Sequence, residues 1–150
     1  MATQQIPIIV DTREQRPWSF QPEEFAVIKR GLPAGDYSIV GLENRVAIER
    51  KSLGDFVQTV ISEWLRFRKE LNRLGGYDFA AVVVECNIKD IFDHAYDSTA
   101  QPASVLARAA EITIDHAIPV TFAGDHLLAG QFAARMLKLA WKRWGSNANA

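Results

Sequence analysis

The sequence has 150 residues, of which 48% are hydrophobic and 23% charged, and its formal net charge is −1. This length allows one domain with a sizeable core, and the composition is typical of a soluble globular protein. No apolar run is long enough to cross a bilayer, the N-terminus does not resemble a signal peptide, and Cys86 alone cannot form an internal disulfide. We therefore expect one intracellular domain in a reducing compartment, with no membrane association.

The first third of the chain predicts short strands joined by loops. Residues 6–10 form an apolar run typical of a buried strand, and residues 25–29 are compatible with a short strand or a helical turn. Residues 37–40 and 45–49 predict a hairpin that turns near Gly41. A sheet is therefore expected to begin here.

Residues 52–74 carry the longest helical signal. Apolar residues recur at spacings of three, four and seven, Ser52 is a suitable N-cap, and the pair Gly75-Gly76 ends the pattern. The opposite face of this helix carries three basic residues at helical spacing, namely Arg66, Lys69 and Arg73.

The rest of the chain alternates strands with helices. The continuous Ala/Val run in residues 78–85 predicts a strand buried on both faces, which is typical of a parallel sheet. The other expected elements are helices at 87–96, 103–117 and from Asp125 to Trp144, and a strand at 119–122. This alternation predicts an α/β fold with a mixed central sheet flanked by helices. We expect one domain over residues 1–144 and a flexible tail at 145–150.

Three consecutive charged residues, Glu49, Arg50 and Lys51, follow an apolar run that predicts a core strand. Burying them costs free energy unless each finds a partner or a metal ion. Side chains alternate along a strand, so Glu49 and Lys51 share one face and Arg50 points to the other. Asp36 comes from the adjacent strand or turn, where it can meet Glu49 and Lys51.

Two carboxylates and an ammonium group at one point suit the hydrolysis of a phosphodiester. The carboxylates can hold a hard divalent cation through oxygen, and such a cation activates water and neutralises charge on phosphate. The lysine can orient the water or stabilise the transition state. His94, His116 and His126 lack the spacing of metal ligands.

The order of these motifs resembles one known family. Asp11-Thr-Arg13-Glu14, then Gly35-Asp36, then Glu49-Arg50-Lys51 followed by Asp55, is similar to the XPF-type structure-specific nuclease domain of the PD-(D/E)XK superfamily. The motifs cover residues 6–56, and fainter similarity reaches about residue 85. The resemblance implies a restriction-endonuclease-like fold and a metal-dependent DNA endonuclease that acts in DNA repair or recombination, in the cytoplasm, nucleoid or nucleus.

The resemblance also implies roles for individual residues. Mg²⁺ or Mn²⁺ would be bound by Asp11, Asp36 and Glu49, Glu14 would support the site, and Lys51 would serve the attacking water or the developing charge. Arg50 could instead brace an acid or the following helix, and Asp55 could be a helix cap or a site contact. An arginine in the helix at 52–74 often belongs to the family's site, and Arg66 is the nearest match.

The resemblance finally implies partners. Branched DNA such as flaps and forks would be the substrate, with Arg66, Lys69 and Arg73 along its backbone. A homodimer is expected through the helix that ends at Trp144, because its apolar surface exceeds what one core needs. In this family a tandem helix-hairpin-helix domain typically follows, and we expect none within these 150 residues. Two alternatives are a non-catalytic DNA-binding or scaffold protein and a recombination-type nuclease with another nucleic-acid substrate.

Overall fold

Six strands form one mixed sheet in the computed structural model, which describes residues 4–145. The order across the sheet is β2–β1–β3–β4–β5–β6. The strands are β1 (Ile6–Val10), β2 (Phe25–Lys29), β3 (Tyr37–Ile39), β4 (Val46–Ser52), β5 (Phe79–Glu85) and β6 (Val120–Phe122). The predicted α/β fold with a mixed central sheet is confirmed, and the segment at 25–29 is a strand.

The strand directions bring the charged motifs to one edge of the sheet. Strand β3 is antiparallel to β1 and β4, whereas β1 is parallel to β2, β4 to β5, and β5 to β6. The carboxyl ends of every strand except β3 therefore meet at one edge, and β3 begins there. This edge is where open α/β sheets place their ligand-binding residues.

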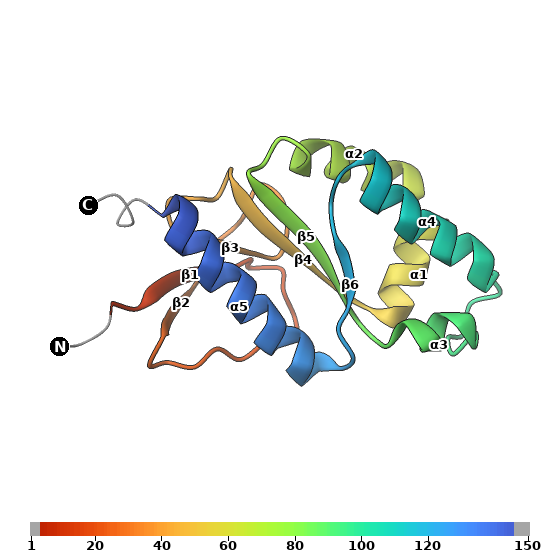
Figure 1. Cartoon of the computed structure of the whole chain (residues 1–150), viewed down its shortest axis with the longest axis horizontal. Coiled ribbons are helices and arrows are strands. Elements are labelled where there is room, and N and C mark those ends of the chain that lie inside the picture. Colours follow the sequence, from red (N-terminus) through yellow and green to blue (C-terminus); the bar gives the residue numbers. More distant parts are fainter. Residues whose placement is uncertain (1–3, 146–150) are drawn as a thin grey trace.

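Helices cover both faces of the sheet. Figure 1 shows α5 lying across one side of it, with α1 to α4 gathered on the other. The helices are α1 (Leu53–Ile61), α2 (Trp64–Leu74), α3 (Ile88–Phe92), α4 (Pro102–Asp115) and α5 (His126–Trp144). The N-caps predicted at Ser52 and Asp125 are confirmed, since their side chains accept hydrogen bonds from the N–H groups of Asp55 and Leu128.

The prediction of one helix over residues 52–74 is wrong. The chain forms two helices, α1 and α2, with a break at Ser62 and Glu63. The N–H groups of both residues donate to the carbonyl of Gln58, which closes α1. Arg108 of α4 donates to a carbonyl in the last turn of α1 at 3.3 Å, and this contact satisfies a group that the helix itself leaves free.

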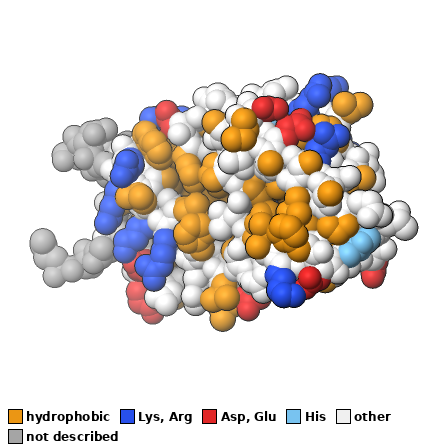
Figure 2. All heavy atoms as spheres, turned by 45° about the vertical axis from the view of Figure 1, so that its right-hand side comes forward, with side chains coloured by type: hydrophobic (Ala, Val, Ile, Leu, Met, Phe, Trp, Pro, Cys, Tyr) orange, Lys and Arg blue, Asp and Glu red, His pale blue; other side chains and the backbone are white. Residues whose placement is uncertain are grey.

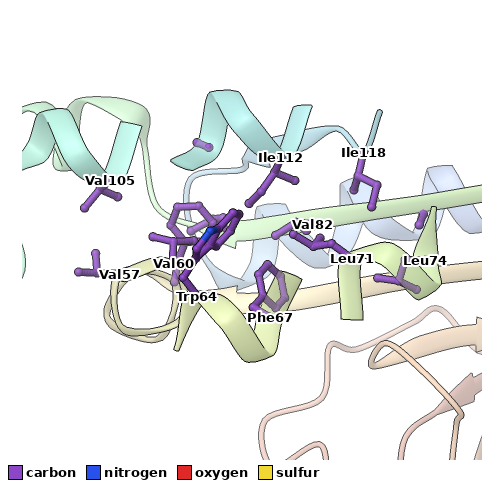
Figure 3. Packing of buried hydrophobic residues seen from close by; sticks show 14 of the residues in the cluster. Val57, Val60, Trp64, Phe67, Leu71, Leu74, Val82, Val105, Ile112 and Ile118 are labelled. Carbon is purple, nitrogen blue, oxygen red and sulfur yellow. The ribbon is translucent and has the colours of Figure 1, made fainter. Parts of the chain in front are cut away.

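Two hydrophobic cores lie on opposite faces of the sheet. The first packs α1, α2 and α4 against one face of β4 and β5, as the interlocked side chains in Figure 3 show. The second packs α5 against β1, β3 and the other face of β4 through small residues, including Ala129, Ala133 and Ala140. Gly130 allows this close approach, because a Cβ there would lie 3.0 Å from the side chain of Trp18.

Three further predictions concern a short helix, the C-terminal tail and membrane association. The helix predicted at 87–96 is shorter, and ends at Phe92. The tail predicted at 145–150 lies outside the described residues apart from Gly145. Within residues 4–145, no helix combines the length and the apolar character that a bilayer crossing needs.

Candidate active site

A polar cavity of about 370 Å³ opens at the carboxyl end of β4. Its lining includes residues that come from the loop after β1, the turn before β3, the end of β4 and the first turn of α1. Among them are the predicted site residues Glu14, Asp36, Arg50, Lys51 and Asp55.

Gly35 delivers Asp36 to this cavity. Its φ is +78°, a conformation that glycine adopts without strain, and a Cβ on it would lie only 2.9 Å from the Cβ of Ala47. The N–H of Asp36 then donates to the carbonyl of Ile48 at 2.9 Å, which ties the turn to β4. The Gly-Asp motif therefore has a local cause, since any other residue before Asp36 would displace it.

Asp36 and Glu49 form an acid pair beside Lys51, in which Glu49 is buried and Asp36 is half-buried. Each carboxyl group influences the pKa of the other. The N–H of Arg50 donates to Oδ2 of Asp36 at 2.7 Å, and Nζ of Lys51 lies 3.5 Å from Oε2 of Glu49. The alternation predicted for the end of β4 thus places Glu49 and Lys51 together on the face that α2 covers.

Burial dominates the electrostatics of this acid pair. The pKa of Asp36 is raised to about 6, chiefly by burial and also by the neighbouring charge of Glu14, against an opposing hydrogen bond from the backbone of Arg50. Burial also raises the pKa of Glu49 well above its usual value, and the nearby carboxylates of Asp36 and Glu70 add to this effect. A cation bound beside the two carboxyl groups would oppose this effect, because an opposite charge lowers the pKa of an acid.

Asp11 contacts different groups from those of the acid pair. Its Oδ1 accepts from the N–H of Leu32 at 2.8 Å, and its Oδ2 accepts from Nε of Arg13 at 2.7 Å. Burial acts to raise the pKa of Asp11, but the hydrogen bonds from Arg13 and Leu32 outweigh it and the pKa lies below its usual value. Arg13 therefore occupies the carboxylate that the family resemblance implies as a third metal ligand.

Arg50 points to the opposite face of β4, where it contacts Glu14. Its Nε and Nη2 each lie 2.8 Å from an oxygen of that carboxylate, so the contact has two parallel hydrogen bonds. Burial acts to raise the pKa of Glu14, but these bonds outweigh it and the pKa is lowered. Arg50 therefore braces an acid, as one of the two predicted alternatives has it, and the braced Glu14 lines the cavity.

Ser52, and not the side chain of Asp55, caps α1 in the described contacts. The N–H of Asp55 donates to Oγ of Ser52 at 3.2 Å, which is the N-cap contact of α1. Asp55 also lines the cavity, between α1 and the end of β4.

The predicted DNA-binding residues Arg66, Lys69 and Arg73 are exposed along α2. Arg73 donates to the carbonyl of Pro33 at 2.8 Å, so this basic stripe adjoins the loop that leads to Asp36. Arg66 pairs with Glu63 at 2.7 Å across one turn, yet its side chain remains 79% exposed.

Several residues that lie near the site are not predicted by any sequence motif. Glu70 of α2 accepts from the N–H of Gly35 at 3.4 Å and contributes to the potential at Glu49. Glu85, Trp18 and His126 join on the far side of Arg50, at distances of 2.5–2.8 Å between Glu85 and the other two. These residues lie far apart along the chain, so no local pattern predicts their contacts. Glu85 does share one feature with Glu49, since each is a charged residue at the end of a buried strand.

The acid pair has the chemistry of a magnesium or manganese site. Across residues 4–145, no three Asp, Glu, His or Cys side chains already converge as a complete ligand set. Mg²⁺, however, is usually held by one or two carboxylates while water and substrate phosphates fill its other positions. Two neighbouring carboxyl groups that raise each other's pKa, one buried and one lining an open polar cavity, fit that mode of binding.

The comparison with family models gives a match to the ERCC4 domain over residues 10–136. The chain belongs to the ERCC4 domain family. The match confirms the resemblance to the XPF-type nuclease domain and spans all the motifs discussed above. No curated protein matches the chain.

Solved structures share this ERCC4 fold. XPF from Aeropyrum pernix aligns with a TM-score of 0.68 and 22% identity, covering 89% of this chain and 61% of its own. XPF from the same organism in complex with DNA aligns with a TM-score of 0.67 and 23% identity, covering 93% of this chain and 66% of its own. The chain therefore spans less than two thirds of either relative.

The raised pKa of Asp36 predicts a pH-dependent stability of the metal-free protein. The folded state holds a proton that the unfolded chain releases near pH 3.8, so the stabilisation is complete below that pH and is lost as pH rises through about 6. The free energy of unfolding should fall over this interval by up to about 3 kcal/mol, at 1.36 kcal/mol per pKa unit. Urea titrations in chelator will measure it.

Asp36→Asn should reduce this fall, because an amide cannot release the proton. The change left in that variant would come from Glu49. Asp97→Asn, which removes an exposed acid of the loop before α4, is the control and should keep the parental dependence. An Asp36→Asn variant that loses stability as steeply as the parent would contradict the assignment.

Proposed function

We propose that this ERCC4 domain is a metal-dependent DNA endonuclease that hydrolyses phosphodiester bonds. The observation that carries the proposal is the acid pair Asp36 and Glu49, with Nζ of Lys51 3.5 Å from Glu49 and with Asp36 and Lys51 lining a polar cavity. Two carboxylates that oppose each other gain most from a divalent cation, and a neighbouring ammonium group suits the charge that develops on a phosphate.

Asp36 and Glu49 would hold the metal ion, and Asp11 would join them once Arg13 released it. The ion, when bound, would lower the pKa of a bound water and neutralise charge on the phosphate. Lys51 lies between Glu49 and the ring of Phe67, whose centroid is 5.4 Å from Nζ. From this position Lys51 would orient the attacking water or stabilise the transition state.

Branched DNA is the substrate that the family resemblance favours, with roles in repair or recombination. One of the aligned relatives was solved in complex with DNA, which supports DNA as the partner of this chain as well. The exposed basic stripe of α2, defined as Arg66, Lys69 and Arg73, leads away from the cavity and would follow the phosphate backbone.

Removing the metal or the lysine should abolish or weaken cleavage. We expect cleavage of flap or fork DNA in Mg²⁺ or Mn²⁺ and none in excess chelator. Lys51→Ala should lower the single-turnover rate by about 10²–10³, the usual effect of losing one charge-stabilising donor. Lys89→Ala on α3, which removes an exposed lysine away from the cavity, serves as the control. Full cleavage in chelator would disprove the metal requirement.

Replacing Lys69 and Arg73 with Ala should weaken DNA binding and reduce its salt dependence, by up to about 0.9 in the slope for each lost duplex phosphate contact. Saturating DNA should restore most of the cleavage rate, because the acid pair remains intact. Arg68→Ala is the matched control, since this exposed arginine lies about 140° around α2 from Arg73 at about 100° per residue. A parental salt slope in the double variant would place the DNA elsewhere.

We further propose that the protein is a homodimer through the outer face of α5. This face exposes Leu128, Phe132 and Leu139 by 52%, 42% and 50%, although the other side of α5 already packs on the sheet. Figure 2 shows hydrophobic side chains gathered across the middle of the molecule, with basic side chains towards its left edge, its upper right and its bottom. A stripe of this kind on a helix that already has a core suits a second copy of the chain.

Changing Phe132 and Leu139 to Glu should give a monomer, because charge on both sides of such an interface would remain unpaired. Light scattering at tens of micromolar, roughly above a micromolar Kd, will measure the mass of parent and variant. Ile114→Glu is the control, since Ile114 is 77% exposed on α4. A monomeric parent would disprove the dimer.

A further inference from the structure

Glu85, the last residue of β5, accepts hydrogen bonds from three elements of the fold. Its Oε1 lies 2.9 Å from Nη1 of Arg50. Its Oε2 lies 2.8 Å from the indole Nε1 of Trp18 and 2.5 Å from Nδ1 of His126, the first residue of α5. The carboxylate is only 7% exposed, so its contacts are made in a poorly hydrated environment where hydrogen bonds to charged groups contribute most.

Glu85 completes the surroundings of Arg50. Glu14 takes two donors of the guanidinium and Glu85 takes a third, while the side chain of Arg50 is 11% exposed. An arginine presents its donors in a rigid planar fork, so acceptors on two sides fix both the position and the plane of the group.

Arg50 connects this network to the acid pair on the other face of β4. Its backbone N–H donates to Asp36 at 2.7 Å, whereas its side chain holds Glu14, which lines the same cavity. A change in the position of Arg50 would therefore move Glu14 directly and alter the end of β4 where Glu49 and Lys51 lie.

We infer that Glu85 is a positioning residue of the site, which acts by holding the guanidinium of Arg50 against Glu14. Glu85 touches neither Asp36 nor Lys51 in the described contacts, so its effect on cleavage passes through Arg50. The effect on cleavage rests on the proposed nuclease function, whereas the effect on Arg50 does not.

The test uses Glu85→Gln, which keeps the size of the side chain but leaves a single acceptor oxygen. Whichever way the amide turns, Arg50 and Trp18 both lose their charged acceptor, because the group that then faces each of them is a neutral oxygen or an NH₂. The matched control is Glu111→Gln, because Glu111 also pairs with an arginine, Arg108, at 2.9 Å, but on α4. Unfolding midpoints of both variants will verify that they fold.

The first measurement needs no activity. In ¹⁵N NMR spectra of the metal-free protein, the Nε–H signal of Arg50 should be protected from exchange with water in the parent. We expect faster exchange of this signal, and a shift of the Trp18 indole signal, in Glu85→Gln but not in the control. An Arg50 signal that is unchanged in Glu85→Gln would overturn the inference.

The second measurement is single-turnover cleavage together with DNA binding in Ca²⁺. Residues that orient a functional group through a hydrogen bond typically contribute about 10–100-fold to activity. We therefore expect the cleavage rate of Glu85→Gln to fall by about 10–100-fold. Its DNA affinity should stay within about twofold of the parent. A parental rate at saturating DNA, or a loss confined to DNA affinity, would overturn the positioning role.

Arg50→Lys provides a second variant, which keeps the charge but lacks the planar fork. If Glu85 acts through Arg50, adding Glu85→Gln to Arg50→Lys should cost much less than it costs alone, whereas additive losses would overturn the inference. If the parent cut no DNA in any divalent cation, the proposed function would fail, and the NMR measurement would still decide whether Glu85 positions Arg50.

Discussion

The contacts of Arg50 with Glu14 on one side and Glu85 on the other allow a charged sequence to lie at the centre of this fold. An arginine at the end of a core strand must exchange water for protein acceptors, and the loop after β1 and the end of β5 supply them through Glu14 and Glu85. The same contacts tie the N-terminal loop, the centre of the sheet and α5 together. Removing one partner of such a buried ion pair destabilises a protein far more than removing one partner of an exposed ion pair does.

The other face of β4 follows the opposite principle. Asp36 and Glu49 face each other beneath the cavity, with Lys51 as their nearest cation. On one side of the strand the guanidinium of Arg50 is paired with two carboxylates, whereas the other side holds two acids with raised pKa values beside a single lysine. Since side chains alternate along a strand, three consecutive residues are enough to build both sides. A shift of β4 by a single residue would exchange them.

The sequence allowed the local features to be predicted, because they follow from periodicity and short motifs. The hairpin, the caps at Ser52 and Asp125, and the shared face of Glu49 and Lys51 belong to this group. The break between α1 and α2 was hidden, since the apolar spacing continues across it while a residue of α4 contacts the end of α1. Glu85 was hidden because its partners lie 35 to 67 residues away along the chain.

The place of His126 has a consequence for biosynthesis. His126 begins α5, and α5 follows every strand of the sheet along the chain. During translation all six strands leave the ribosome before the imidazole that contacts Glu85, so a nascent chain can build its sheet while the cluster behind Arg50 is still incomplete. Docking of α5, which also closes the second hydrophobic core, would then be the step that completes this cluster.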